Sequence, residues 1–165
     1  MVFRDATETT VIRNNRWRCD HGWDIDLDDG SSNYHIYNNL CLHGGLKLRE
    51  GFARTVENNI MVNNTFHPHV WFANSQDIFR HNIVTTPYRP IQVKEWGKET
   101  DTNFFVTKQG LEQAQKRGTD LHSLYGDPLF IAPEKGDYRV KENSPALKTG
   151  FRNFDMEHFG VQCLS

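Results

Sequence analysis

A pattern of apolar residues around a polar pair that contains asparagine recurs along the first two thirds of the chain. The units are Ile12-Arg13-Asn14-Asn15-Arg16-Trp17, Ile36-Tyr37-Asn38-Asn39-Leu40-Cys41, Val56-Glu57-Asn58-Asn59-Ile60-Met61, Phe79-Arg80-His81-Asn82-Ile83-Val84 and, more weakly, Asp101-Thr102-Asn103-Phe104-Phe105. The anchoring asparagines, at positions 15, 39, 59, 82 and 103, are 24, 20, 23 and 21 residues apart. A period of this length indicates that each unit is one supersecondary turn stacked on its neighbours.

The repeat predicts an all-β fold, a right-handed parallel β-helix of roughly five coils. The Leu-x-x-Leu-x-Leu spacing of leucine-rich repeats is absent, and the units show strand-like rather than helical periodicity. At one fixed place in every coil, the asparagine side chains are expected to form a ladder of amide hydrogen bonds along the stack.

A second strand is predicted in each coil, with apolar residues pointing inward and polar residues outward. These strands are 25–27, 46–48, 70–72 and 91–93, which leaves Asp26, Lys47, Trp71 and Gln92 on one outer face. Aligning Leu27 with Leu48 places Asp28 beside Arg49 and Asp29 beside Glu50.

The pattern changes after Asn103, and the chain is expected to finish its single domain in two further parts. We predict β-helix coils over 1–106, a helical segment over 107–124 and an irregular C-terminal cap over 125–165 that covers the last coil. The repeat is already running by Val11. We therefore expect this chain to be the C-terminal part of a longer β-helix, with an exposed N-terminal coil through which it can form oligomers.

Composition narrows the choice of partners. The net charge of −2 with mixed signs argues against nucleic acid or an anionic membrane as a partner. No apolar run has the roughly 18 residues of a membrane span. Residues 1–10 contain no signal-peptide core, so the location stays open, and full-length relatives are expected to be secreted, periplasmic or cytoplasmic bacterial proteins. Three cysteines at unrelated spacings, Cys19, Cys41 and Cys163, imply no disulfide framework or zinc site.

The stretch from Trp23 to Ser32 carries the strongest candidate chemistry, because four carboxylates fall within six residues. Asp28 or Asp29 is a candidate nucleophile, and Glu50, one coil later, a candidate general acid and base. Carboxylates at matching corners of stacked coils lie roughly 5 Å apart, which is the spacing of retaining glycosidases. Lys47 and Arg49 are expected to keep the nucleophile ionised. Two alternatives stay open: the bases merely neutralise an acidic face, or Asp24, Asp26 and Asp28 bind calcium.

The run His67-Pro68-His69-Val70-Trp71 lies one coil above Glu50 and is expected to contact substrate. An outward Trp71 flanked by His67 and His69 suits stacking on a sugar ring and hydrogen bonding to it. Together with Asp26, Lys47 and Arg49, these residues form the predicted substrate-binding set.

The run WDIDLDDGSSNYHIYNNLCLHGGLKLREGF, followed by ENNIMVNNTFHPHVWF, resembles right-handed parallel β-helix carbohydrate-active enzymes, most closely glycoside hydrolase family 120, the β-xylosidase type. The tail GDPLFIAPEKGDYRVKENSPALKTGF is similar to the closing segment of many bacterial β-helix glycan-degrading proteins. The resemblance implies retaining hydrolysis of β-xylosides, with an aspartate nucleophile at Asp28 or Asp29 and an acid/base at Glu50. Family members have more coils than this chain.

We therefore expect a retaining glycoside hydrolase that acts on plant-type oligosaccharides or polysaccharides and needs no organic cofactor. The alternatives are a calcium-dependent polysaccharide lyase with Lys47 or Arg49 as the base, and a non-catalytic glycan-binding fragment. Calcium remains an open requirement under the first alternative.

Overall fold

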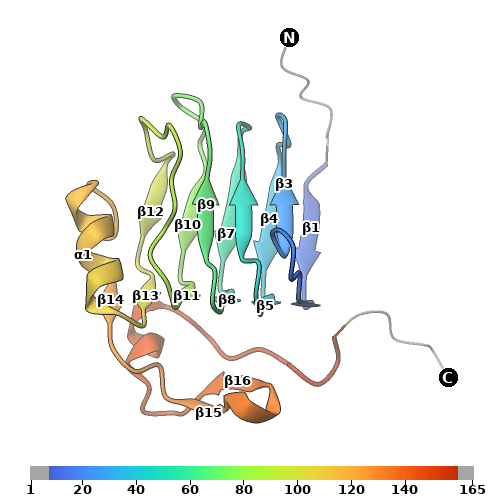
Figure 1. Ribbon diagram of the computed structural model, residues 1–165, viewed down its shortest axis with the longest axis vertical. Coiled ribbons are helices and arrows are strands. Elements are labelled where there is room, and N and C mark those ends of the chain that lie inside the picture. Colours follow the sequence, from blue (N-terminus) through green and yellow to red (C-terminus); the bar gives the residue numbers. More distant parts are fainter. Residues whose placement is uncertain (1–7, 160–165) are drawn as a thin grey trace, which may run out of the picture.

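A computed structural model describes residues 8–159 as a stack of coils built from short parallel strands (Figure 1). Sheet A contains β1 (Thr10–Arg13), β4 (Tyr34–Tyr37), β7 (Arg54–Glu57), β10 (Ile78–Arg80) and β12 (Glu99–Asp101) in that order. Sheet B contains β2 (Arg16–Trp17), β5 (Leu40–Cys41), β8 (Ile60–Met61), β11 (Ile83–Val84), β13 (Phe104–Phe105) and β14 (Leu124–Tyr125). The third, sheet C, contains β3 (Ile25–Leu27), β6 (Leu46–Leu48) and β9 (Phe66–Pro68). The predicted all-β parallel β-helix is confirmed.

The asparagine ladder runs inside the corner between sheets A and B. The side-chain amide of Asn39 donates to Oδ1 of Asn59 at 3.0 Å, and Asn59 and Asn82 donate in the same way at 3.0 and 3.1 Å. Asn39, Asn59, Asn82 and Asn103 are fully buried. The residue before each rung, such as Asn58, has a positive φ that turns the chain sharply. The predicted ladder is therefore present, and it fixes the coil register.

Apolar side chains from all three sheets fill the interior of the solenoid. They include Ile36, Val56 and Phe79 from sheet A, Cys41, Met61 and Val84 from sheet B, and Leu46, Leu48 and Phe66 from sheet C. Phe66 stacks on Phe79 with ring centroids 4.0 Å apart. Cys41 is a buried free thiol, and Cys19 is free and half-buried, whereas Cys163 lies outside the described residues. These residues occupy the inward positions of their strands, which alternate with the outward ones.

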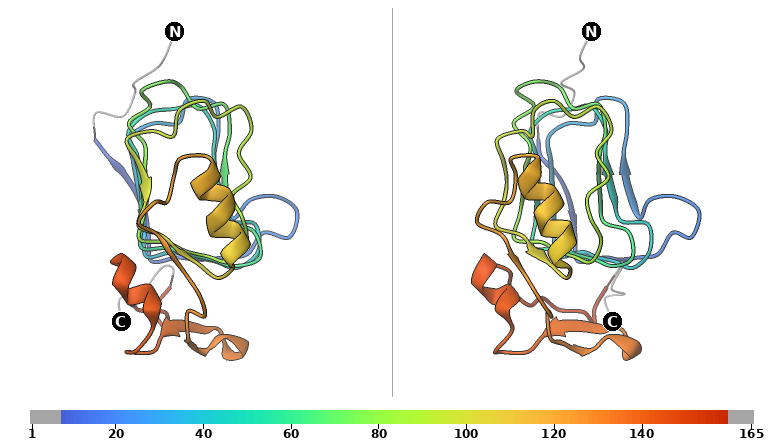
Figure 2. Two further views of the ribbon diagram at one scale, coloured as in Figure 1. Left: turned by 90° about the vertical axis from the view of Figure 1, so that its left-hand side faces the viewer. Right: turned by 60° about the vertical axis from the view of Figure 1, so that its left-hand side comes forward.

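The helix α1 (Lys108–Lys116) closes the C-terminal end of the stack, as the end-on views show (Figure 2). Its N-cap is Thr107, whose hydroxyl accepts a hydrogen bond from the backbone of Gly110. Leu111 and Ala114 are buried on the interior core. It is shorter than the predicted helical segment, because the chain turns at Gly118 with φ of +85°. Among the described residues, no helix is long and apolar enough to cross a membrane.

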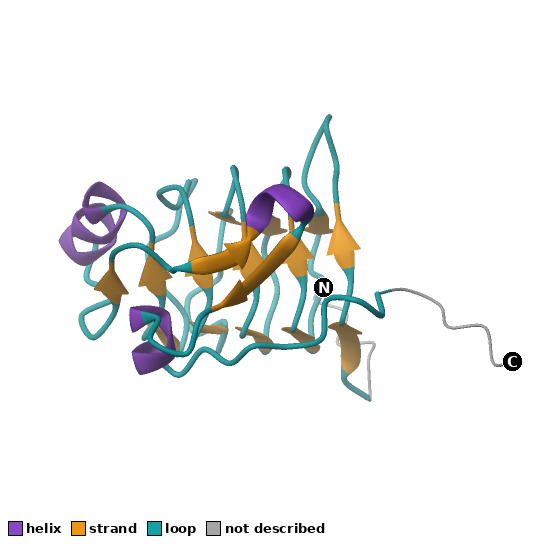
Figure 3. Cartoon of the chain, turned by 90° about the horizontal axis from the view of Figure 1, so that it is seen from below, coloured by secondary structure: helices purple, strands orange, loops and turns teal. Residues whose placement is uncertain are grey.

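The segment after β14 does not cover the last coil, so this part of the prediction is wrong. It forms the antiparallel hairpin of β15 (Phe130–Ala132) and β16 (Asp137–Val140), with the short helices η1 (Pro133–Lys135) and η2 (Pro145–Thr149). It then runs back along the outer face of sheet B (Figure 3). The physical reason is that outward positions of sheet B are apolar. Leu40, Ile60, Ile83 and Phe104 form a second core with Val140, Ala146, Phe151, Phe154 and Met156.

Candidate functional site

The outer face of sheet C carries a row of polar side chains, one from each coil. Strand pairing places Asp26 beside Lys47 and Lys47 beside His67. The Lys47 ammonium lies 2.8 Å from Asp26 and 3.4 Å from Asp28. The predicted alignment of Leu27 with Leu48 is confirmed, and with it the neighbourhood of Asp26 and Lys47.

Trp23 covers part of this row, a role that the sequence did not predict. The Lys47 ammonium lies 4.3 Å from the centroid of the Trp23 ring, a cation–π contact. The rings of His67 and His69 each approach Trp23 edge-on at 5.9 Å. The Lys47 side chain is consequently only 8% exposed. The signal available in the sequence was position alone: Trp23 lies two residues before the acidic strand β3.

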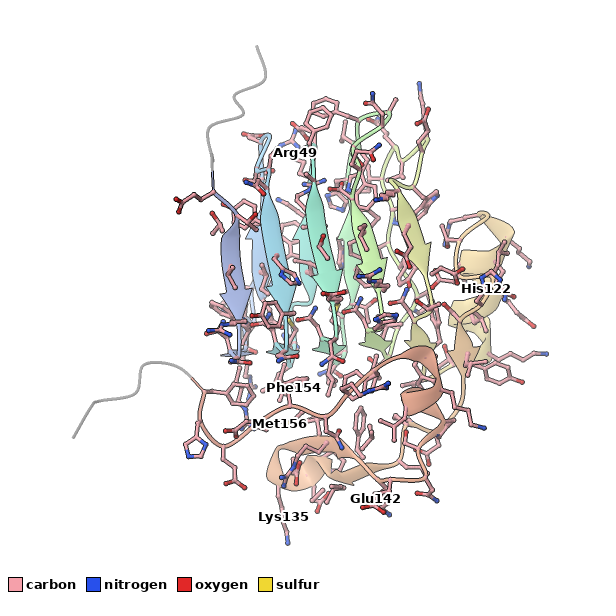
Figure 4. The ribbon with its side chains drawn as sticks, turned by 180° about the vertical axis from the view of Figure 1, so that it is seen from behind. Arg49, His122, Lys135, Glu142, Phe154 and Met156 are labelled. Atoms are coloured by element: carbon pink, nitrogen blue, oxygen red, sulfur yellow. The ribbon has the colours of Figure 1, made fainter. Side chains whose placement is uncertain are left out.

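The loops that lead from sheet C to sheet A, residues 28–33, 49–53 and 69–77, are called the crest loops here. In the stick view Arg49 lies at the edge of the solenoid formed by these loops (Figure 4). Its guanidinium contacts three carboxylates: Asp28 at 3.4 Å, Asp29 at 3.0 Å and Glu50 at 2.8 Å. The three predicted catalytic residues are therefore brought together, with Arg49 among them. Asp29 is the most open, with 77% of its side chain exposed, and Glu50 the least, with 20%.

The electrostatic surroundings shift the pKa values of Asp28, His67 and His69. Burial acts to raise the pKa of Asp28, but the charge of Lys47 and hydrogen bonds from the Asp29 backbone, Lys47 and Arg49 outweigh it and lower that pKa. Burial beside His69 lowers the pKa of His67 to about 4. Burial and the neighbouring Lys47 also lower the pKa of His69. At neutral pH, Asp28 is thus ionised and His67 is uncharged.

His67 lies deeper than the prediction of direct substrate contact requires. It is buried, and its Nε2 lies 2.7 Å from Oδ1 of Asn64. Its buried ring packs edge-on against Trp23. His69 is only half-buried and remains accessible. Asp26, Asp28, Asp29, Arg49 and His69 therefore present the open part of the predicted set.

Trp71 is not on the outer face, so its predicted stacking role is wrong. Its ring is 5% exposed, and its Nε1 donates to the backbone carbonyl of Leu48 at 2.9 Å. The strand of this coil is Phe66–Pro68, four residues earlier than predicted, and Trp71 lies in the third crest loop that follows it, which is longer than the first two. The chain turns inward at Val70, which has φ of +53°. In the next coil, the predicted strand 91–93 is reduced to a single bridge between His69 and Ile91.

Asp24 does not belong to the outer acidic face either, so the predicted calcium set is wrong at this position. Its buried carboxylate accepts hydrogen bonds from the backbone N–H groups of Cys19, His43, Gly44 and Gly45. These bonds tie the loop before β3 to the loop before β6. Within residues 8–159, no cluster of three or more His, Cys, Asp or Glu side chains is arranged to hold a metal ion.

A fully buried ion pair supports the crest loops, and sequence reasoning missed it. Arg54 and Asp77 are 0% exposed and joined by two side-chain hydrogen bonds of 2.9 and 2.6 Å. The remaining guanidinium nitrogen of Arg54, Nη1, donates to the backbone carbonyl of Arg49. A Cβ at Gly51 would lie 2.9 Å from the Arg54 guanidinium, so the loop that carries Arg49 and Glu50 packs directly on this pair. The residues are 23 apart, one coil, which is the signal that could have found them.

Comparisons of the chain with models of protein families, with curated proteins and with solved structures find no match. The similarity to family 120 glycoside hydrolases therefore remains a prediction that rests on the residues themselves.

Proposed function

We propose that this protein is a glycoside hydrolase that cleaves oligosaccharides at the crest loops by a retaining mechanism, with β-xylosides as the predicted substrates. The observation that carries the proposal is the meeting of Asp28, Asp29 and Glu50 around Arg49. Retaining glycosidases need two carboxylates on either side of the scissile bond, one ionised and one able to transfer a proton.

The roles follow from the environment of each carboxylate. Asp28, whose pKa is lowered, is the nucleophile: its carboxylate attacks the anomeric carbon while the glycosidic C–O bond breaks. Glu50, the least exposed of the three, protonates the leaving oxygen and then takes a proton from the water that releases the sugar. Asp29 assists binding. A sugar must displace Arg49 from at least one carboxylate, which is inexpensive because exposed ion pairs contribute only about 0–1 kcal/mol.

The test is turnover of an aryl β-xyloside and of xylo-oligosaccharides by the intact chain. Glu50→Gln should reduce kcat by about 10²–10⁴-fold, the range for loss of general acid–base catalysis. Asp28→Asn should abolish formation of the glycosyl-enzyme intermediate, which mass spectrometry detects. Glu99→Gln is the matched control, because Glu99 pairs with Arg80 on sheet A, away from the crest loops. Proton NMR of the first product should show a retained anomeric configuration, and an inverted product would refute the assigned nucleophile.

Glycan binding without catalysis is the second candidate, and the position of Arg49 favours it. Its guanidinium lies against all three carboxylates, where a hydrolase would hold the scissile bond. Oligosaccharide binding that is unchanged by Glu50→Gln, in a wild-type chain without turnover, would establish this function. Release of unsaturated product, detected by ultraviolet absorbance and stimulated by calcium, would instead identify a polysaccharide lyase.

A further inference from the structure

A hollow lies on the crest loops, and none of the predicted site residues lines it. It has a volume of 460 Å³, within the roughly 300–1,000 Å³ typical of small-molecule sites. Residues from all three crest loops line it, among them Ser32, Phe52, Ala53, Asn74, Ser75 and Gln76.

The lining has the chemistry of a site for a neutral polyol. None of the lining side chains is ionisable, and those of Ser32, Asn74 and Gln76 can both donate and accept hydrogen bonds. Phe52 adds an aromatic ring, held in place by stacking on Phe72 with ring centroids 5.1 Å apart. Aromatic rings next to amides and hydroxyls match the apolar faces and hydroxyl edges of sugars. A phosphate or carboxylate ligand would find no cation among the lining residues.

The backbone that forms the hollow is held in an unusual conformation. Ala53 and Gln76 are non-glycine residues with φ of +54° and +62°, the left-handed region. The loops are tied together across coils, since Ala53 N–H donates to the Ser75 carbonyl at 2.8 Å. Such strained positions persist only where surrounding contacts hold them, and they cluster at binding sites. The hollow is therefore largely formed before a ligand arrives.

The carboxylates lie on two of the three loops that form the hollow. Asp28 and Asp29 open the first crest loop, which ends beside Ser32, and Glu50 opens the second, which ends beside Phe52. Gly30 N–H donates to the Glu50 carbonyl at 2.8 Å, and Phe52 N–H donates to the Ser32 hydroxyl at 2.9 Å. Both pairs of contacts join these loops, so the two sites have a common framework.

We propose that this hollow is a further subsite of a neutral oligosaccharide: the two units joined by the scissile bond lie at the carboxylates, and the hollow holds the next unit of the chain. The inference rests on the proposed function for the two units at the carboxylates, but it concerns binding rather than cleavage. It makes the protein selective for chains longer than a disaccharide.

The test is binding of xylotetraose and xylobiose to the full chain that carries Glu50→Gln, measured by calorimetry and by amide chemical shifts. Xylotetraose should shift the amides of Ala53, Ser75 and Gln76. Asn74→Gly with Gln76→Gly removes both amides, and glycine relieves rather than adds strain at these positive-φ positions. This double variant should weaken xylotetraose binding about tenfold and xylobiose binding less than about twofold, the scale of one or two lost hydrogen bonds.

Asn14→Gly is the matched control, because Asn14 is an exposed asparagine with φ of +53° in the turn between β1 and β2. It should leave both affinities unchanged. Equal weakening of the two sugars by the double variant, or the absence of shifts at Ala53, Ser75 and Gln76, would overturn the subsite. Stronger binding of tetragalacturonate at these amides would overturn its neutral character. A wild-type chain that binds xylotetraose in the hollow without cleaving it would refute the hydrolase proposal and leave the subsite standing.

Discussion

The outer faces of sheet B and sheet C are built on the same coils, yet the chain treats them in opposite ways. Outward positions of sheet B carry Leu40, Ile60, Ile83 and Phe104, and the C-terminal segment packs over all of them. Outward positions of sheet C carry Asp26, Lys47 and His67, and the Trp23 ring packs against Lys47 and His67. Phe154 and Met156 can be followed between the solenoid and the hairpin in Figure 4, on the side away from Arg49.

The difference shows how one scaffold separates stability from ligand binding. Inward residues of both sheets form the same apolar core, so the two faces differ only in what points outward. Apolar outward residues must be covered, because an exposed patch of that size would drive association. Charged outward residues instead satisfy one another in ion pairs that a ligand can rearrange. Sheet B therefore adds a second core, and sheet C and its crest loops present the candidate site.

The largest loss of stability is expected at the buried ion pair of Arg54 and Asp77, which supports the crest loops. Asp77→Asn leaves the Arg54 guanidinium buried without its counter-ion and should lower the free energy of unfolding by about 3–5 kcal/mol. Urea denaturation followed by circular dichroism measures this loss. The double variant Arg54→Met with Asp77→Leu is the control, since removing both charges should recover most of the stability. A single variant that unfolds like the wild type would show that the pair is not a foundation of the crest loops.

The covered face should be almost as sensitive. Phe151 is fully buried against sheet B, and Phe151→Ala should cost about 3 kcal/mol, at the lower end of the range for phenylalanine in a core. The change should also expose the C-terminal segment to limited proteolysis before the coils unfold. Leu121→Ala is the control, because Leu121 is exposed and its removal should change stability by less than about 0.5 kcal/mol. Equal protease resistance in both variants would mean that the segment is held by contacts other than this core.

The asparagine ladder, which joins sheets A and B, ends on a carboxylate that makes stability depend on pH. Oδ1 of Asp120 accepts hydrogen bonds from Asn103 at 2.9 Å and from Ser123 at 2.7 Å. Burial raises the pKa of Asp120 to about 6, although these hydrogen bonds oppose the shift. The folded state therefore holds a proton between about pH 4 and 6 that the unfolded state has lost, and its stability falls as pH rises through this window.

Asp120→Asn should remove this dependence while keeping an oxygen that accepts the same hydrogen bonds. The wild type minus variant difference in unfolding free energy should fall by about 3 kcal/mol between pH 4 and 6 and stay constant above. Taking the difference matters, because Asp101 and Glu57 have lowered pKa values and produce the opposite trend in both proteins. Urea midpoints at pH 4, 5, 6 and 7 measure it. If the difference in unfolding free energy did not change with pH, the proton would belong to a group other than Asp120.

The sequence predicted what depends on repetition and missed what depends on loop length. Asn39, Asn59 and Asn82 recur at one place per coil, so both the fold and the pairing of Leu27 with Leu48 followed from spacing. Trp71 was misplaced because it lies in the third crest loop, which is longer than the first two. The spacing from the ladder marks the true strand, since Phe66 follows Asn59 by the same seven residues as Leu46 follows Asn39. The crest cluster around Arg49 was predictable, since it lies within a few residues of an aligned strand.

Contacts between distant parts of the chain were beyond the sequence pattern. The C-terminal segment looked like an end cap because solenoids need one, but α1 supplies that cap. Leu40 and Cys41 are consecutive apolar residues, and this was the available sign that sheet B is buried on both faces. A strand with one face exposed to solvent would have alternated apolar and polar residues, as Ile25–Leu27 does.

The smallest stability effect is expected at the outer face of sheet C, and it tests the difference between sheets B and C most directly. Asp26→Asn breaks an ion pair of 2.8 Å to Lys47, yet it should cost less than about 1 kcal/mol because the Asp26 side chain is 40% exposed. The Lys47 ammonium would still lie 3.4 Å from Asp28 and 4.3 Å from the centroid of the Trp23 ring, so its charge would still be compensated. Leu40→Asn, an outward change on sheet B, should cost at least about 3 kcal/mol, since it buries an amide among apolar residues. Urea midpoints of the two variants measure the contrast. Comparable losses would mean that sheet C, like sheet B, is a structural face, and would remove the reason to place a ligand there.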